Sequence, residues 1–219
     1  MKGTMMEATA GMVALARDVG ARRRQVAQRR GYLRTISTPE TDTAADQRGA
    51  LGELMVARFI MARGKRVLMA ALVNPRGPGA PSDLHVFRQG AAHGLDVKCV
   101  DALAPWETYP VTTRKAAQIG WSAIVVVAWP FIPALAPVER FMAQMDGRQA
   151  WCAGIIPRST LRRHPVGQGR YGRVAFQVPQ DAMLDLAVVA DGLDAGTCVV
   201  PGDFLGACGS QLDTAKAPE

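Results

Sequence analysis

The longest uncharged stretch of the sequence does most to restrict its fold. Residues 119–138 contain no Lys, Arg, Asp or Glu. Within this stretch, residues 121–129 (WSAIVVVAW) are valine-rich and apolar almost throughout, which is typical of a central strand buried on both faces. Pro130, Pro133 and Pro137 follow, and prolines at this density disfavour a membrane-spanning helix. We therefore expect a buried strand followed by a rigid loop.

The remaining patterns indicate helices and strands around this strand. Apolar residues spaced i, i+3 and i+4 predict a helix over 47–63 that ends before Gly64. Further strands are expected at 65–73, 82–88, 94–100, 138–145, 150–156 and 174–178, and short helices at 111–119, 157–163 and 180–190. The order helix, strand, strand, strand, helix, strand predicts an α/β or α+β fold, with a mixed central sheet flanked by helices.

The positive charge of the chain is concentrated near its N-terminus. The net charge is +7, and residues 1–34 hold eight basic residues against two acidic ones. Residues 35–46 are polar and threonine-rich, as linkers are. These patterns predict a basic arm with a polar linker over 1–46, a globular domain over 47–200 and a C-terminal tail over 201–219. The arm favours a polyanionic partner such as nucleic acid, and we expect its deletion to leave the chemistry of the domain intact.

Cysteine usage and missing motifs exclude several classes of protein. The four cysteines are dispersed without a C-x-x-C pair, which argues against a zinc site and a disulfide framework. This usage predicts a reducing, cytoplasmic compartment, and we expect no membrane association. The sequence also lacks a G-x-S-x-G elbow, a Walker loop and an H-E-x-x-H motif, so the corresponding hydrolases and NTPases have no support.

A predicted hairpin brings two aspartates together. If Gln89-Gly90 forms a two-residue loop, Asp83 lies directly opposite Asp96 in the neighbouring strand. Residues paired in this way point to the same face, with Cβ atoms about 5 Å apart. A bulge at His93-Gly94 would change this register, so both arrangements remain open at this point.

The opposed carboxylates predict a cation site. Two carboxylates this close repel each other unless a cation lies between them. The two-residue period of a strand places Lys98 on the same face as Asp96. Two carboxylates and a lysine suit Mg²⁺-assisted hydrolysis of a phosphodiester, because Mg²⁺ prefers oxygen ligands and lysine can stabilise the transition state.

These residues resemble a known nuclease motif. Pro81-Ser82-Asp83, followed after a short hairpin by Asp96-Val97-Lys98, is similar to the PD-(D/E)XK nuclease superfamily. The family pattern has proline directly before aspartate, whereas Ser82 intervenes here. The segment VTTRKAAQ (residues 111–118) resembles the region after the lysine in archaeal-type Holliday junction resolvases. The resemblance covers about residues 47–129 and implies a restriction-endonuclease-like αβββαβ core.

The resemblance also implies a function and a set of site residues. It implies an endodeoxyribonuclease that depends on Mg²⁺, with Mn²⁺ able to substitute. Asp83 and Asp96 would be the main metal ligands, and the Val97 carbonyl would be a further ligand. Glu53, on the helix before the strands, would bind the metal or its water, and Lys98 would be the catalytic lysine.

Basic residues outside this motif are candidates for contacts with DNA. The resemblance implies phosphate-binding or supporting roles for Arg114, Lys115 and Gln118. Residues 157–173 contain five arginines and no acid, which favours a clamp on the DNA backbone through Arg158, Arg162 and Arg163. A solvated arginine-rich turn is the alternative for that segment.

Several functional alternatives remain for the chain. One is a structure-selective enzyme such as a junction resolvase, and another is an effector nuclease of a defence or mobile-element system. A third is a non-catalytic nucleic-acid-binding protein that retains the nuclease fold. Because cutting both strands takes two sites, the resemblance also suggests a homodimer.

Overall fold

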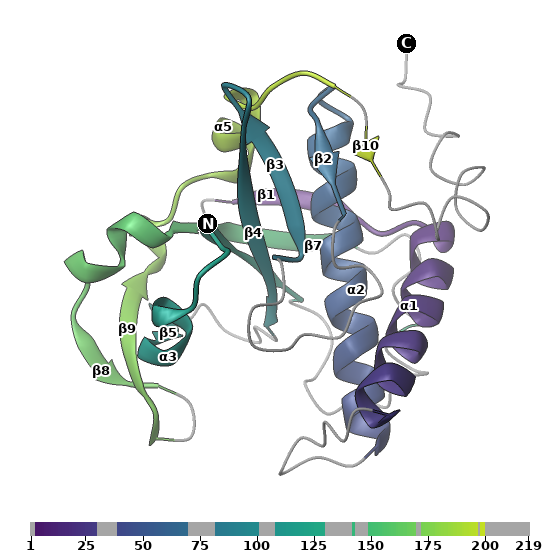
Figure 1. Ribbon diagram of the computed structural model, residues 1–219, viewed down its shortest axis with the longest axis horizontal. Coiled ribbons are helices and arrows are strands. Elements are labelled where there is room, and N and C mark those ends of the chain that lie inside the picture. The colour runs from purple at the N-terminus through teal and green to yellow at the C-terminus, as the bar shows by residue number, and fades with distance from the viewer. Residues whose placement is uncertain are drawn as a thin grey trace.

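The central element of the fold is a mixed β-sheet. The computed structural model describes residues 3–29, 39–69, 82–100, 108–129, 142, 149–169, 172–196 and 198–199. Seven described strands form this sheet in the order β1 (Thr4–Glu7), β7 (Gln149–Pro157), β6 (Ala123–Ala128), β4 (Ala91–Val100), β3 (Leu84–Arg88), β2 (Val67–Leu68) and β10 (Cys198–Val199). Strand β4 runs parallel to β6 and antiparallel to β3. The expected fold class, a mixed sheet flanked by helices, is therefore confirmed (Figure 1).

The uncharged stretch forms the buried strand that its composition predicts. All six residues of β6 are buried, and they alternate between two apolar cores. Val125 and Val127 pack into the larger core, while Ile124 and Val126 pack into the smaller one. This strand is apolar throughout because both of its faces are covered.

No helix in the described part of the chain is long and apolar enough to cross a membrane.

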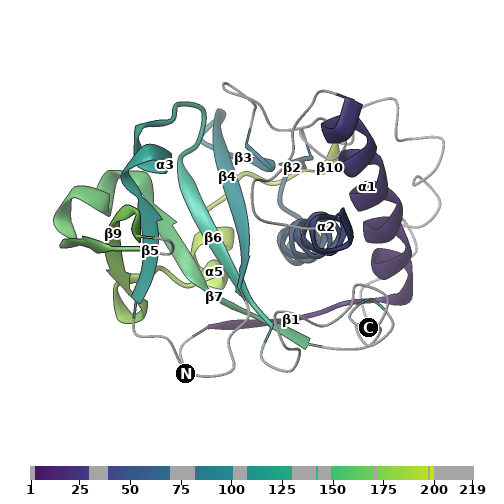
Figure 2. The ribbon, with the colours of Figure 1, turned by 90° about the horizontal axis from the view of Figure 1, so that it is seen from below.

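Two long helices cover one face of the sheet. Helices α1 (Ala10–Arg29) and α2 (Pro39–Met61) pack against each other, and Figure 2 shows α2 almost end-on between α1 and the sheet. A side chain on Gly52 of α2 would overlap the sulfur of Cys99 in β4. Glycine therefore allows α2 to approach closely the face of β4 that carries Val97 and Cys99.

A second, smaller sheet covers the other face. It contains β5 (Thr108–Thr112), β9 (Val174–Pro179) and β8 (Val166–Gln168). Around it lie the short helix α3 (Thr113–Ala117) and the 3-10 helices η1 (Arg158–Arg163) and η3 (Gln180–Ala182). Helix α5 (Leu186–Asp191) instead packs against β7, with Leu186 and Ala190 in the larger core. Trp121, Val111 and Val178 contribute to the core beneath this sheet. The sequence patterns did not predict β5 or β8, because residues 111–119 suggested one helix and no strand was expected between residues 156 and 174.

The N-terminal segment differs from the expected arm. Strand β1 pairs with β7, and α1 buries Met12, Ala16 and Val19 against the rest of the larger core. Helix α2 begins at Pro39, so residues 39–46 of the expected linker are helical. The segment is integral to the fold because the apolar residues of α1 recur on one face, although five of its twenty residues are arginine.

Several other elements have bounds that differ from the predicted ones. The expected strand over 65–73 is limited to β2 in its described part, and the helix over 157–163 is the 3-10 helix η1. The expected strand over 138–145 lies outside the described residues except for Met142, and the tail over 201–219 lies outside them entirely.

The β3–β4 hairpin has the predicted two-residue turn. Gln89 and Gly90 adopt left-handed backbone angles, with φ of 52° and 77°, as a tight hairpin turn requires. The Asp194 carboxylate accepts hydrogen bonds from both turn N–H groups at 2.8 Å. Leu84 pairs with Leu95, without the bulge considered above, so the same register places Asp83 opposite Asp96.

We expect Asp194→Asn to destabilise the hairpin at neutral pH and to have less effect in acid. The two backbone N–H groups hold the pKa of Asp194 below its ordinary value. A lowered pKa in the folded state stabilises the protein above the unfolded-state pKa of about 3.9, and this stability disappears as the pH falls through the lowered value. Thermal unfolding should give a lower Tm for the variant at pH 7 and convergence with the wild type as the pH falls through the lowered pKa of Asp194. Equal Tm values at pH 7 would contradict this role.

Candidate functional site

Three oxygen-bearing groups converge on the ammonium group of Lys98. Its Nζ lies 3.1 Å from Asp96 Oδ2, 3.5 Å from the Val97 carbonyl oxygen and 4.0 Å from Asp83 Oδ2. The two carboxylate oxygens can therefore be no further apart than 3.1 Å plus 4.0 Å, about 7.1 Å. Both aspartates are buried, at 1% exposure for Asp83 and 6% for Asp96. The structure thus brings together four of the residues that the sequence singled out.

Backbone contacts hold Asp83 in this position. Its Oδ2 accepts a hydrogen bond of 2.8 Å from the Val97 N–H in the neighbouring strand. Beside it, the Ser82 hydroxyl donates to the Gly120 carbonyl at 2.6 Å, and a side chain on Gly94 would overlap that hydroxyl. Ser82 therefore links the start of β3 to the loop before β6. This link gives a structural role to the serine that separates Pro81 from Asp83.

Lys115 also belongs to this group. Its ammonium forms an ion pair with Asp96 Oδ2, the same oxygen that Lys98 contacts. The backbone of Lys115 is fixed as well, because its N–H donates to the Thr112 hydroxyl at 3.1 Å and its carbonyl accepts from the Trp121 indole at 3.1 Å. The sequence predicted Lys115 as a DNA-binding residue and gave no sign of its contact with Asp96. Thr112 caps the N-terminus of α3 one turn before Lys115, and this capping residue is the local sequence signal that bears on the orientation of Lys115.

Glu53 lies in a different environment. It is fully buried on α2, and both of its carboxylate oxygens accept from the Arg23 guanidinium of α1, at 2.9 Å and 2.5 Å. Burial, followed by the charge of Glu53, raises the pKa of Cys99 to about 12. Because Cys99 and Lys98 are adjacent in a strand, they point to opposite faces, and Glu53 lies toward the Cys99 face. Among the described residues, no three His, Cys, Asp or Glu side chains are grouped closely enough to hold a metal ion.

Arg23 is a structurally important residue that the sequence analysis did not single out. It lies in phase with the apolar residues of α1, and its side chain is only 10% exposed. An arginine on the buried stripe of a helix is the signal that could have identified it, because a buried guanidinium needs an acidic partner. Deletion of the N-terminal arm was expected to leave the chemistry of the domain intact. The structure shows instead that Arg23 of this segment supplies the positive partner of Glu53, which belongs to the predicted domain over 47–200.

We expect Arg23→Met to lower the free energy of unfolding by about 3–5 kcal/mol, since it removes one partner of a buried ion pair. The double variant Arg23→Met/Glu53→Leu should recover much of this loss, because neither charge remains. Chemical denaturation of the three proteins measures the difference. Unchanged stability in the single variant would show that the ion pair does not support the α1–α2 contact.

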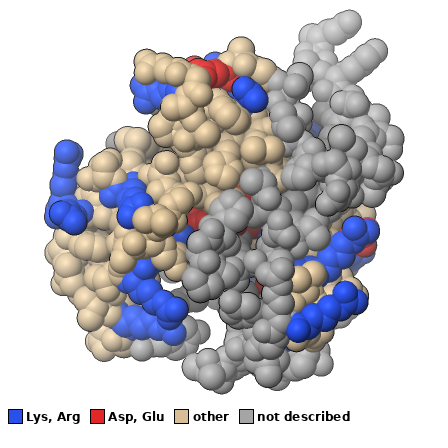
Figure 3. Space-filling view, viewed as in Figure 1, with Lys and Arg blue, Asp and Glu red and all other residues tan. Residues whose placement is uncertain are grey.

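The other predicted DNA-binding residues lie around the smaller sheet. Arg114 and Gln118 are exposed on and just after α3, while Arg162 and Arg163 are exposed on η1. Arg158 is partly buried, with its guanidinium carbon 5.4 Å from the centre of the Trp121 ring, and Lys115 Nζ lies 5.2 Å from the same centre. Lys and Arg side chains recur over this part of the surface in Figure 3, where acidic atoms occupy small areas. The arrangement provides a basic flank beside the buried aspartates.

Comparisons with known proteins add no family assignment. No protein-family model matches the chain, and neither the curated proteins nor the solved structures gave a significant match.

Proposed function

We propose that the protein is a Mg²⁺-dependent endodeoxyribonuclease with a restriction-endonuclease-like core. The observation that carries this proposal is the convergence of Asp83, Asp96 and the Val97 carbonyl on Lys98. Acidic oxygen ligands beside a lysine are the parts that metal-assisted phosphodiester hydrolysis needs. Nothing in the chemistry of this group requires a redox cofactor or a nucleophilic side chain.

The order of elements supports the proposed core. Reading from α2, the chain continues through β2, β3 and β4 to α3 and β6, with β5 inserted before α3. In the sheet, β2, β3, β4 and β6 are consecutive neighbours. This order agrees with an αβββαβ core whose third strand carries Asp96 and Lys98. On this interpretation, β1, α1, β7 and the smaller sheet are additions to the core.

The donor groups fit a magnesium ion. Mg²⁺ takes oxygen ligands and usually retains several waters, so two carboxylates and one carbonyl form a suitable partial shell. Asp83, Asp96 and the Val97 carbonyl would hold the ion, which when bound would neutralise phosphate charge and acidify a bound water. Glu53 was expected to contribute, but its bidentate contact with Arg23 supports a structural role in this arrangement.

The two lysines have a defined part in the proposed reaction. In the structure, Lys98 and Lys115 both neutralise Asp96. A divalent ion on the carboxylates would take over this neutralisation and leave the ammonium groups able to turn toward a phosphate. Lys98 would then stabilise charge on the scissile phosphate or orient the attacking water, and Lys115 would hold a neighbouring phosphate.

One observation favours a second candidate function. Asp96 paired with two ammonium groups is already a neutralised structural unit, as expected in a nucleic-acid-binding protein that performs no cleavage. Such a protein would bind DNA equally well with Mg²⁺ or with a chelator. A cleavage assay therefore separates the two candidates.

We expect the wild-type protein to cleave plasmid or branched DNA in Mg²⁺ and to be inactive in EDTA. Asp96→Asn should reduce the cleavage rate by about 100-fold or more, because it removes a metal ligand and charge from the site. Lys98→Met should cause a loss of similar size. The matched control is Asp191→Asn on α5, which removes an exposed carboxylate and should retain the wild-type rate.

The outcomes of this assay are distinct. Cleavage that survives Asp96→Asn would overturn the catalytic assignment. DNA binding without cleavage, unchanged by Mg²⁺, would instead support the non-catalytic candidate. Preferential cutting of four-way branched DNA over linear duplex would identify the enzyme as a structure-selective resolvase.

A further inference from the structure

A separate pocket lies at the end of the central sheet where β6 begins and β7 ends. Its volume is about 740 Å³, which lies in the range of sites for organic ligands and far exceeds the space for a single inorganic ion. Residues from β3, β4, β6, β7, η1 and α5 contribute to it. It includes neither Asp83 nor Asp96, so it is not the candidate metal site.

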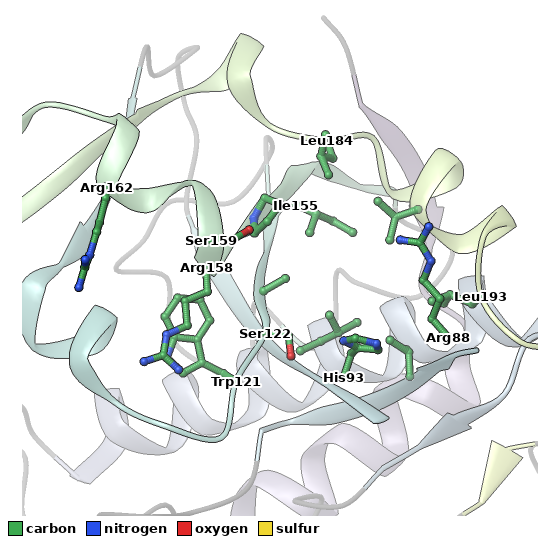
Figure 4. A pocket seen from close by; sticks show the side chains of 15 residues that line it. Arg88, His93, Trp121, Ser122, Ile155, Arg158, Ser159, Arg162, Leu184 and Leu193 are labelled. Carbon is green, nitrogen blue, oxygen red and sulfur yellow. The ribbon is translucent and has the colours of Figure 1, made fainter. Parts of the chain in front are cut away.

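The lining of the pocket combines an apolar floor with basic ends. The apolar floor contains Val86, Leu95, Ala123, Ile155, Leu184 and Leu193. In Figure 4, Arg158 lies beside Trp121 at one end, and Arg88 lies near Leu193 at the other. None of the described residues that line the pocket is acidic. A ligand that fits this pattern has a flat or apolar centre with negative charge on both sides.

Backbone hydrogen bonds hold the walls in place. Ile155 and Leu184 exchange two N–H···O bonds of 2.8 Å and 2.9 Å, which fix the segment before α5 against β7. The Arg158 N–H donates to the Ser122 carbonyl at 2.9 Å, which joins the start of η1 to the start of β6. The pocket is therefore formed by the fold itself, and a ligand would not have to order its main walls.

Trp121 connects this pocket to the candidate active site. It lines the pocket, and its indole donates to the carbonyl of Lys115, whose ammonium contacts Asp96. Lys115 Nζ and Arg158 Cζ lie 5.2 Å and 5.4 Å from the Trp121 ring centre, so the two groups are at most about 10.6 Å apart. Successive phosphates of one strand rise about 3.4 Å along duplex DNA. The two cations therefore lie within the reach of a few nucleotides of one strand.

We propose that this pocket binds one nucleotide of a single DNA strand that passes the candidate active site, an inference that rests on the proposed nuclease function. The base lies on the apolar floor beside Trp121, and backbone phosphates of the same strand pair with Arg158 at one end of the pocket and with Arg88 at the other. Sites for single strands combine cationic contacts to the backbone with stacking of bases on aromatic side chains. The pocket accordingly selects substrates in which a nucleotide can leave the duplex, at an end, a flap or a branch point.

The test is binding of a fluorescent single-stranded oligonucleotide, measured by anisotropy in EDTA so that Mg²⁺-dependent cleavage is absent. A second oligonucleotide of the same length contains abasic residues in place of nucleotides. We expect the wild type to bind the strand with bases at least about fivefold more tightly, the lower end of the effect of one base contact. Arg88→Ala and Arg158→Ala should weaken binding, and the pocket-filling variant Val189→Trp should abolish the preference for bases.

The control is Arg17→Ala, which removes one positive charge from an exposed position on α1. It should retain the preference for the strand with bases. Equal binding of both oligonucleotides by the wild type, or pocket variants that behave like Arg17→Ala, would overturn the proposal. Neither result would affect the nuclease assignment, which depends on cleavage in Mg²⁺. Conversely, a base preference that the pocket variants abolish would support the nucleotide site even if the protein cleaves no DNA.

Discussion

The register of the β3–β4 hairpin is the constraint on which the candidate site depends. A shift of one residue between paired strands would turn every side chain of one strand to the opposite face. The left-handed Gln89–Gly90 turn sets this register, and Asp194 fixes the turn through two backbone N–H groups. Asp83 and Asp96 consequently meet on one face, and Asp83 accepts a hydrogen bond from the Val97 N–H. The convergence on Lys98 follows from this pairing.

Charge compensation shapes the structure around this hairpin. Desolvating a carboxylate is costly unless cations or N–H groups replace its water. Asp96 is compensated by Lys98 and Lys115, and Glu53 is compensated by Arg23 on the other side of β4. In the first arrangement, the two lysine side chains are partly exposed, at 28% for Lys98 and 22% for Lys115. The second is a buried bidentate pair, which suits a fixed contact between helices.

Local patterns predicted much of the fold and the core of the site. The uncharged run predicted β6, and the two-residue loop correctly predicted the pairing that opposes Asp83 and Asp96. The errors involve contacts between distant segments. The contact of α1 with α2 includes an ion pair between residues 30 positions apart, and the smaller sheet pairs β5 with the distant strand β9. Residue spacing within a segment does not encode such partners, so the arginine-rich helix resembled an arm and Lys115 resembled a surface residue.

In the proposed site, Asp83 and Asp96 together hold a divalent cation beside Lys98. Titration with Mn²⁺, with the free ion measured by electron paramagnetic resonance, tests this claim without any substrate. We predict that the wild type and Asp191→Asn bind Mn²⁺ alike, and that Asp83→Asn/Asp96→Asn binds it at least about tenfold more weakly because two anionic oxygen ligands are lost. Circular dichroism confirms that the variants are folded. Equal Mn²⁺ affinity in all three proteins, or no binding by the wild type, would show that Asp83 and Asp96 do not form a cation site.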